Sequence, residues 1–316
     1  MEITALHWTL FLVFVVIMLM LDLGVFHKKD TEVKVKEAIL WSAFWILLAL
    51  LFNAGVYFYG GKTKALEFFT AYILEKSLSV DNLFVFMMIF GYFCIPPRYQ
   101  HKILFWGIFG ALIMRAGFIF AGIALIRQFS WIMYIFGAFL VYTGIHMFFE
   151  KEDKADFKPE KNIILRTFRK MMPVTAHNPE GKFFVRKGGI LFATTFFLAL
   201  LFIEVSDVIF AVDSVPAVLS VSNDTFIIFT SNIFAILGLR SLYFALNGIM
   251  GFFHYLKYAL AFILSFIGIK MCVNELGHAL DWDFHISNYV SLAVILSSLA
   301  LSIVLSVVKR KKSCDL

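Results

Sequence analysis

The stretch "FIEVSDVIFAVDSVPAVL" (202–219) places three carboxylates, those of Glu204, Asp207 and Asp213, among residues that are otherwise apolar. The apolar run extends upstream to residue 190, so the segment is long enough to cross about 30 Å of hydrocarbon. An ionisable group inside a bilayer costs at least about 2.5 kcal/mol and usually marks a functional site. The stretch therefore predicts a membrane helix that carries an acidic site.

The composition assigns the whole chain to the membrane. Of the 316 residues, 61% are hydrophobic, and the mean hydropathy is +0.84. Several uncharged runs have the length of one crossing helix, whereas the alternating strands of about ten residues that build an outer-membrane barrel are absent from the pattern. We expect an all-α polytopic protein with one transmembrane domain (1–316) and about nine helices, at 6–26, 38–59, 66–93, 102–126, 131–149, 189–219, 226–247, 253–275 and 287–308.

The positive charge indicates the orientation. The net charge is +6, and twenty-one lysines and arginines lie in the loops and tail on one side of the predicted helices, against three on the other. This bias predicts an N-out, C-in arrangement in a bacterial inner membrane. Because the charge follows the topology, we expect its partner to be the anionic inner leaflet and not a nucleic acid. The sequence does not indicate an oligomeric state.

The chain contains an internal repeat. "SVDNLFVF" (79–86) aligns with "VSDVIFAV" (205–212), which sets Asp81 on Asp207. "GALIMRAGFIF" (110–120) aligns with "AILGLRSLYF" (235–244), which sets Arg115 on Arg240, and a third match joins 139–148 to 263–272. Each copy has three helices, so the copies must cross the membrane in opposite directions. We expect an inverted repeat of helices 3–5 (66–149) and 6–8 (189–275), joined by a cytoplasmic loop (150–188), as in many secondary transporters.

The acids of the two copies predict a metal site. Asp81 and Asp207 lie near the middle of their helices and are the expected midplane pair. A proline at 216 removes one helical hydrogen bond and is expected to kink or break the helix beside Asp213. Carboxylates with free carbonyls form an all-oxygen shell that suits hard cations such as Mn²⁺, Ca²⁺ or Mg²⁺. The candidate metal ligands are Asp81, Asp207, Asp213, Glu204, Glu75 and Asn82.

Basic residues offer a second interpretation, in which the acids are paired only for stability. Arg115 and Arg240 could neutralise them, and Lys76 beside Glu75 is the expected structural pair. Asp22, near the inner end of the first helix, could reach interfacial water. We therefore treat Arg115, Arg240, Lys76 and Asp22 as candidate ion-pair or gating residues.

Other functional classes find less support. The chain has no GxSG, GxGD or HExxH motif, so we expect no enzymatic activity, and its three cysteines and scattered histidines predict no permanently bound cofactor. A cation channel stays open as an alternative. So does an amino-acid exporter in which Arg115 or Arg240 receives the carboxylate of the substrate.

Four blocks carry a family resemblance: "EKSLSVDNLFVF" (75–86), "EVSDVIFAVDSVPAV" (204–218), "TSNIFAILGLRSLYF" (230–244) and "FFVRKGG" (183–189). With "LDLGVFHKK" (21–29), they resemble the TerC integral-membrane family and its Alx-like branch. The resemblance implies export of divalent cations, chiefly Mn²⁺, and links the family by name to tellurium resistance and redox modulation. We therefore expect a secondary-type exporter with Mn²⁺ as substrate; a stress-response membrane protein without transport is the alternative.

Overall fold

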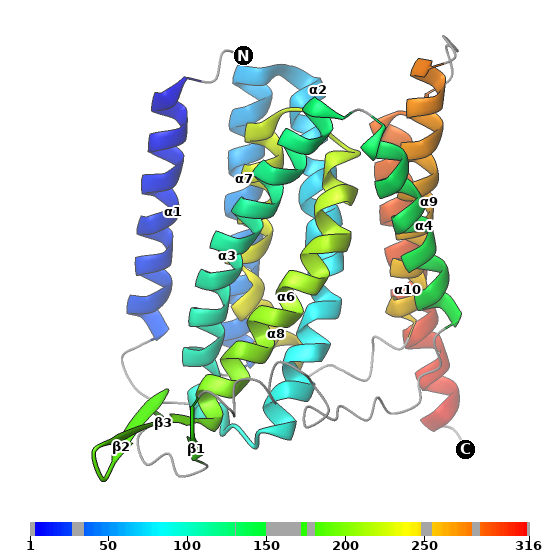
Figure 1. Ribbon diagram of the computed structural model, residues 1–316. Helices are drawn as coiled ribbons and strands as arrows, with labels where there is room; N and C mark the ends of the chain where they lie inside the picture. Colours follow the sequence, from blue (N-terminus) through cyan, green and yellow to red (C-terminus); the bar gives the residue numbers. More distant parts are fainter. Residues whose placement is uncertain are drawn as a thin grey trace.

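The computed structural model is a bundle of long helices with a small sheet at one end (Figure 1). It describes residues 4–26, 35–129, 131–149, 172–175, 181–247, 255–279 and 285–314. The helices are α1 (Ala5–Phe26), α2 (Val35–Tyr92), α3 (Pro97–Gln128), α4 (Ile132–Phe149), α6 (Thr195–Leu219), α7 (Thr225–Leu237), α8 (Leu239–Asn247), α9 (Leu256–Ala279) and α10 (Asn288–Cys314).

In the described part of the chain, eight helical segments are long and apolar enough to cross a membrane, with α7 and α8 forming one of them. This confirms the all-α polytopic class. One of the eight, α2, has 58 residues, which would span about 87 Å if it were straight. It is interrupted at Gly61, where φ is 84° and ψ is 174°, a backbone conformation that suits glycine.

The two arms of α2 lie side by side, with the ring centroids of Phe52 and Phe68 5.3 Å apart (Figure 1). The prediction of separate helices at 38–59 and 66–93 thus corresponds to two arms of α2. The helix α1 begins at the upper end of the bundle in Figure 1, and α10 ends at the lower end. The count of nine crossings and the N-out, C-in orientation stay predictions.

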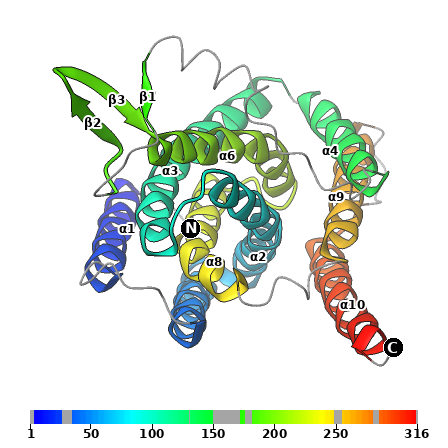
Figure 2. The same ribbon diagram turned by 90° about the horizontal axis from the view of Figure 1, so that it is seen from below.

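The α7–α8 segment is the centre of the main bundle. In its apolar window, 89% of the residues are buried, against 17% in the window of α1. Seen from below, α8 is surrounded by α2, α3 and α6, whereas α4, α9 and α10 form a group to one side (Figure 2). Side chains from α2, α3 and α6 therefore meet in the interior.

Helix α6 differs from its prediction in where it begins and in the effect of its proline. Residues 190–194 form a strand, so the helix begins at Thr195 and not near 189. The helix also continues through Pro216 to Leu219, so the expected break is wrong. Because Pro216 lies in the last turn, its missing N–H removes only one hydrogen bond near the end of the helix.

A three-stranded sheet, which the sequence did not predict, lies within and after the predicted loop 150–188. Its strands are β1 (Val174–Thr175), β2 (Phe184–Lys187) and β3 (Ile190–Thr194), in the order β1-β3-β2. Strands β2 and β3 pair in antiparallel register, with Lys187 opposite Ile190, and β1 is parallel to β3. The remainder of that loop lies outside the described residues.

The helices α4 and α9 approach each other closely at glycines. A Cβ atom on Gly268 would lie 2.5 Å from the carbonyl oxygen of Gly137, and one on Gly144 would lie 2.6 Å from that of Ala261. The offset of 124 that relates the third repeat match converts 137 to 261 and 144 to 268, so it exchanges these two contacts. A two-fold axis between inverted copies would produce this exchange, although the repeat boundaries themselves stay predictions.

The glycine contact between α4 and α9 gives a test of this packing. We expect Gly268→Leu to destabilise the protein by about 1–3 kcal/mol or more, because the new side chain would collide with the backbone of α4. The melting temperature of the purified protein in detergent measures the effect. As a control, Gly117→Leu on α3, where a Cβ atom meets no other atom within 4 Å, should leave the melting temperature equal or higher. Equal melting temperatures for both variants would contradict the contact.

Candidate functional site

Arg115 of α3 is the centre of a buried ion-pair cluster, which we call the Arg115 triad. Its Nη1 atom donates to Oε2 of Glu75 on α2 at 2.6 Å. Its Nε and Nη2 atoms donate to the two carboxylate oxygens of Asp207 on α6 at 3.1 and 3.0 Å. All three side chains are at most 3% exposed. The triad thus joins three helices and carries a net charge of −1.

The Asn82 amide extends the triad along α2. With its oxygen toward the guanidinium, it accepts from Nη2 of Arg115 at 3.2 Å and donates to the carbonyl of Leu78 at 3.2 Å. Asn82 is seven residues after Glu75, so both lie on one face of the helix. Asn82 therefore contacts the cation of the triad and does not compete for its carboxylates.

A small cavity adjoins the triad. Its volume is about 20 Å³, and its polar lining consists of Asp81, Asn82, Arg115, Asp213 and Ser214. Oδ1 of Asp213 accepts a hydrogen bond from Oγ1 of Thr143 on α4 at 3.2 Å. The buried Oγ of Ser214 makes no hydrogen bond to any described residue. About 10–15 Å³ suffices for one water molecule, so this polar cavity has room for a single ion or water.

Asp81 and Asp207, the expected midplane pair, lie at different places: one at the small cavity and the other in the Arg115 triad. Asp207 is bound by Arg115, whereas Asp81 lines the cavity together with Asp213, and Arg115 is common to both. Both Asp81 and Asp213 are half-buried. The structure thus places Asp81 with Asp213 at the cavity and leaves Asp207 to the triad.

Glu204 lies against α3, apart from the lining of the cavity. A Cβ atom on Gly110 would overlap the Glu204 carboxylate, so only a glycine permits this approach. Glu204 is half-buried, and its buried Oε2 atom makes no hydrogen bond to a described residue. The sequence identified Glu204 by its charge, but nothing in the pattern indicated Gly110 as its neighbour.

Lys76 does not pair with Glu75, and this expectation is wrong. Its Nζ atom donates to the carbonyl of Ala235 at 3.1 Å, and a Cβ atom on Gly238 would lie 2.9 Å from it. Successive residues of a helix point about 100° apart, so Glu75 can face Arg115 while Lys76 faces α7. There the ammonium lies at the end of α7, where a positive charge is favourable.

Asp22 is also placed differently from its prediction. It is 4% exposed, and its Oδ1 atom forms an ion pair with Nη2 of Arg240 at 2.6 Å, so it does not reach interfacial water. The same nitrogen donates to the backbone carbonyl of Asp22 at 2.7 Å. This ion pair ties α1 to α8. Arg240, the counterpart of Arg115 in the predicted repeat, therefore binds an acid that lies outside that repeat.

The six predicted ligands do not form one shell. In the described residues, no three histidine, cysteine, aspartate or glutamate side chains are grouped closely enough to hold a metal ion. Two carboxylates line the cavity, together with the polar side chains of Asn82 and Ser214, and Thr143 donates a hydrogen bond to one of these carboxylates, that of Asp213. Thr143 and Ser214 were missed, because a hydroxyl residue in an apolar helix is common and gives no signal until its neighbours are known.

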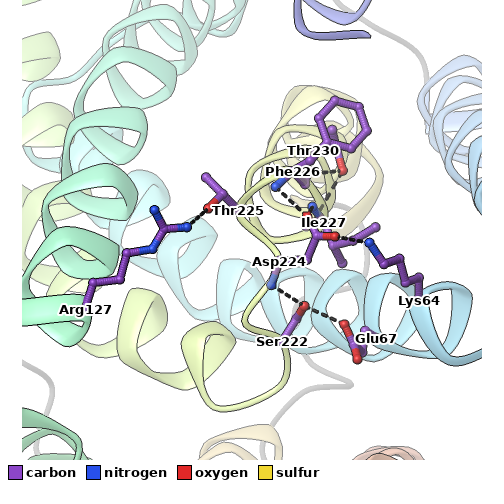
Figure 3. A network of polar contacts seen from close by, with 9 residues as sticks. All are labelled: Lys64, Glu67, Arg127, Ser222, Asp224, Thr225, Phe226, Ile227 and Thr230. Carbon is purple, nitrogen blue, oxygen red and sulfur yellow. Dashed lines mark hydrogen bonds and ion pairs between the residues drawn. The ribbon is translucent and has the colours of Figure 1, made fainter. Parts of the chain in front are cut away.

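A second, larger cavity lies at the upper end of the bundle and has a volume of about 750 Å³. We call it the outer cavity, after the side of the membrane to which the predicted topology assigns it. Figure 3 shows the network beside it: Lys64 pairs with Asp224, and Ser222 donates to Oε2 of Glu67 at 2.6 Å. Asp224 also accepts from the backbone N–H of Phe226 at 3.0 Å and thereby caps α7. These contacts hold the α6–α7 loop against the second arm of α2.

Comparison with known proteins identifies the family. Residues 60–313 match the Integral membrane protein TerC family. A Myxococcus xanthus protein, "Uncharacterized membrane protein STKORF319", is 47% identical over 304 residues, which cover 96% of this chain and 92% of the relative. The "Putative membrane-bound redox modulator Alx" of Salmonella typhi is 45% identical over 312 residues (96% and 94%), and the protein of the same name from Escherichia coli K12 is 43% identical over 312 residues (96% and 94%).

No solved structure matches the chain. The family match covers most of the sequence, including the Arg115 triad and the cavity beside it, and the relatives align over nearly their whole lengths. The chain is an integral membrane protein and belongs to the TerC family.

Proposed function

We propose that this protein is a secondary-type exporter of divalent cations, with Mn²⁺ as its substrate, in a bacterial inner membrane. It would act without catalysis and without a permanently bound cofactor. One observation carries the proposal: Asp81 and Asp213 line a cavity of ionic size inside the membrane-spanning bundle.

The chemistry of the cavity suits a hard dication. Two carboxylates supply two negative charges, which match the charge of one divalent ion. Ser214 adds a hydroxyl oxygen, the amide oxygen of Asn82 is directed to Arg115, and the thioether of Met147 is the one sulfur group among the described lining residues. Oxygen ligands are the preference of Mn²⁺, Mg²⁺ and Ca²⁺, so this lining favours such an ion over soft metals.

Arg115 would act as a fixed counter-charge beside the ion. Its guanidinium lines the cavity, yet its Nε and both Nη atoms donate to Asp207 and Glu75. These two carboxylates hold the positive charge back from the cavity and offset its repulsion of a dication. In this mechanism, Asp207 and Glu75 are positioning residues, and Asp81 and Asp213 contact the substrate.

The last turns of α6 connect the two cavities. Asp213 and Ser214 line the small one, and Leu219 and Ser220 line the outer one. Six residues separate Asp213 from Leu219, a rise of about 9 Å along a helix. Buried apolar side chains, including Val215 and Leu219, fill this interval. Opening it would release the ion toward the outer cavity, as alternating access requires.

The alternative of an amino-acid exporter needs a basic group that can receive the carboxylate of the substrate. Arg115 already donates to two carboxylates, and Arg240 donates to Asp22. The contacts therefore favour a cation over a carboxylate as substrate. Redox modulation is part of the relatives' names; here Cys94 and Cys272 are free thiols in the described residues, and no observation favours redox chemistry further.

Substitution of the cavity acids tests the substrate site. We expect Asp213→Asn and Asp81→Asn each to lower Mn²⁺ export by about tenfold or more, because each removes one of two charges that face the ion. Export is measured as Mn²⁺ movement in proteoliposomes that contain an Mn²⁺-sensitive dye, and as manganese content of cells. Glu37→Gln, an exposed acid at the start of α2, serves as the control and should export normally.

Normal export by both cavity variants would contradict the assigned site. Transport of lysine-like solutes by the wild-type protein, without any effect on Mn²⁺, would instead support the amino-acid exporter. Absence of both transport activities in the wild-type protein, with a thiol redox response in cells that depends on the protein, would support the non-transport alternative.

The Arg115 triad gives a separate prediction about stability. Arg115→Gln should destabilise the protein by about 3–5 kcal/mol, because it leaves two buried carboxylates without their cation. The double variant Arg115→Gln/Asp207→Asn should recover part of this loss, which thermal unfolding in detergent measures. Arg127→Gln, an exposed arginine on the same helix, is the matched control and should change stability by less than about 0.5 kcal/mol. Additive effects of the two triad substitutions would contradict the ion pair.

The single variant Asp207→Asn distinguishes whether Asp207 positions Arg115 or binds the ion itself. If Asp207 only positions Arg115, the variant should lose less Mn²⁺ affinity than Asp213→Asn does, because both cavity carboxylates remain and only the released guanidinium weakens the site. If Asp207 is itself a ligand, as the sequence predicts, binding should fall as much as in Asp213→Asn. Equilibrium binding of Mn²⁺ to the purified variants distinguishes these outcomes.

A further inference from the structure

The β2–β3 hairpin projects from the helical bundle. In Figure 1 it lies at the lower end, and in Figure 2 it extends sideways beyond α3 and α6. Its turn consists of Gly188 and Gly189, with φ angles of 56° and 82°, between the paired residues Lys187 and Ile190. Two consecutive positive φ angles are typical of a tight type I′ turn. The tip is therefore short and well defined.

The base of the hairpin is firmly attached to the bundle. Oγ1 of Thr194 donates to the carbonyl of Lys182 at 2.7 Å, and Nζ of Lys102 on α3 donates to the carbonyl of Gly181 at 3.0 Å. The rings of Phe184 and Phe197 lie 4.6 Å apart, which joins β2 to the first turn of α6. Such a base sets the height and direction of the tip relative to the helices.

The tip combines apolar and basic residues. Ile190 is 59% exposed and Leu191 is 45% exposed, so no other part of the described chain covers these two apolar side chains. Arg186, which pairs with Leu191 across the hairpin, is exposed as well, and so is Lys182 at the base of the hairpin. Aliphatic side chains beside cations are the pattern of segments that lie in the headgroup region of an anionic bilayer. In water alone, the exposed aliphatic pair would be unfavourable.

The position of the hairpin matches this pattern. β3 leads directly into α6, a membrane-spanning segment that starts at Thr195, so the hairpin lies at the boundary where hydrocarbon begins. The charge bias of the sequence assigns the same end to the inner leaflet, which is rich in anionic lipid. The positive charge and the exposed apolar side chains of the hairpin thus indicate the same partner, the anionic inner leaflet.

We propose that the β2–β3 hairpin inserts Ile190 and Leu191 into the bilayer interface and binds anionic phospholipid headgroups through Arg186 and Lys182. The hairpin is a lipid-recognition element that is separate from the Arg115 triad and the cavity. It does not depend on cation export.

The test uses a fluorophore at the tip. In a variant with Cys94, Cys272 and Cys314 replaced by serine, Leu191→Cys is labelled with an environment-sensitive dye, and the protein is placed in nanodiscs of phosphatidylcholine and phosphatidylglycerol. Spin-labelled lipid of either headgroup is then added at equal mole fraction. We expect quenching by both lipids and stronger quenching by the phosphatidylglycerol quencher. Asn223→Cys, an exposed position in the α6–α7 loop, is the control and should not be quenched.

Removal of the positive charge of Arg186 tests the recognition of the headgroup. A basic side chain near an anionic surface contributes about 1 kcal/mol, a factor of about five. Arg186→Gln should therefore lower the preference for the phosphatidylglycerol quencher by up to about fivefold, while quenching by phosphatidylcholine remains. Absence of quenching at position 191, and at Ile190→Cys as a second site, would overturn the insertion. Equal quenching by both lipids would overturn the preference for anionic headgroups.

Discussion

The ion pairs of Arg115 are the constraint on which the rest of the interior depends. A guanidinium and two carboxylates in a membrane-spanning bundle are each costly to bury. They are tolerated because Nε, Nη1 and Nη2 of Arg115 each donate to a carboxylate oxygen. The donors of one planar group are directed to Glu75 on α2 and to Asp207 on α6. This geometry sets the approach of three helices, and the central α7–α8 segment packs against the same assembly.

The triad also divides the buried acids into those that Arg115 binds and those that line the small cavity. Because Arg115 binds Asp207 and Glu75, the charges that remain at the small cavity are those of Asp81 and Asp213. A site that must bind and release a dication benefits from two acids beside a fixed positive charge, since the ion is attracted without being held permanently. The outer cavity lies about 9 Å further along α6 and has a polar lining that could receive the released ion.

Several expectations differed from the structure because they relied on neighbours in the sequence. Lys76 follows Glu75 directly, yet the helix turns the two side chains toward different partners. Pro216 was expected to break α6, but it lies in the last turn, where one lost hydrogen bond has little effect. Asp22 lies near the end of its helix and was expected to meet water, whereas Arg240, 218 residues away, binds it in the interior. Each outcome depends on a contact between distant segments.

The sequence by itself determined the all-α membrane class, the approximate helices, the family, and the residues Asp81, Asp207, Asp213, Glu204, Glu75 and Arg115 as those that need an explanation. It could do so because hydrophobic length and buried charge are properties of single segments. Only the tertiary structure decided which acids are bound to Arg115, which acids line the cavity, that Ser214 lines it too while Thr143 donates to Asp213, and that a small sheet precedes α6. The direction of a side chain toward another helix depends on how the helices rotate and pack, and this information is not contained in the periodicity of any one of them.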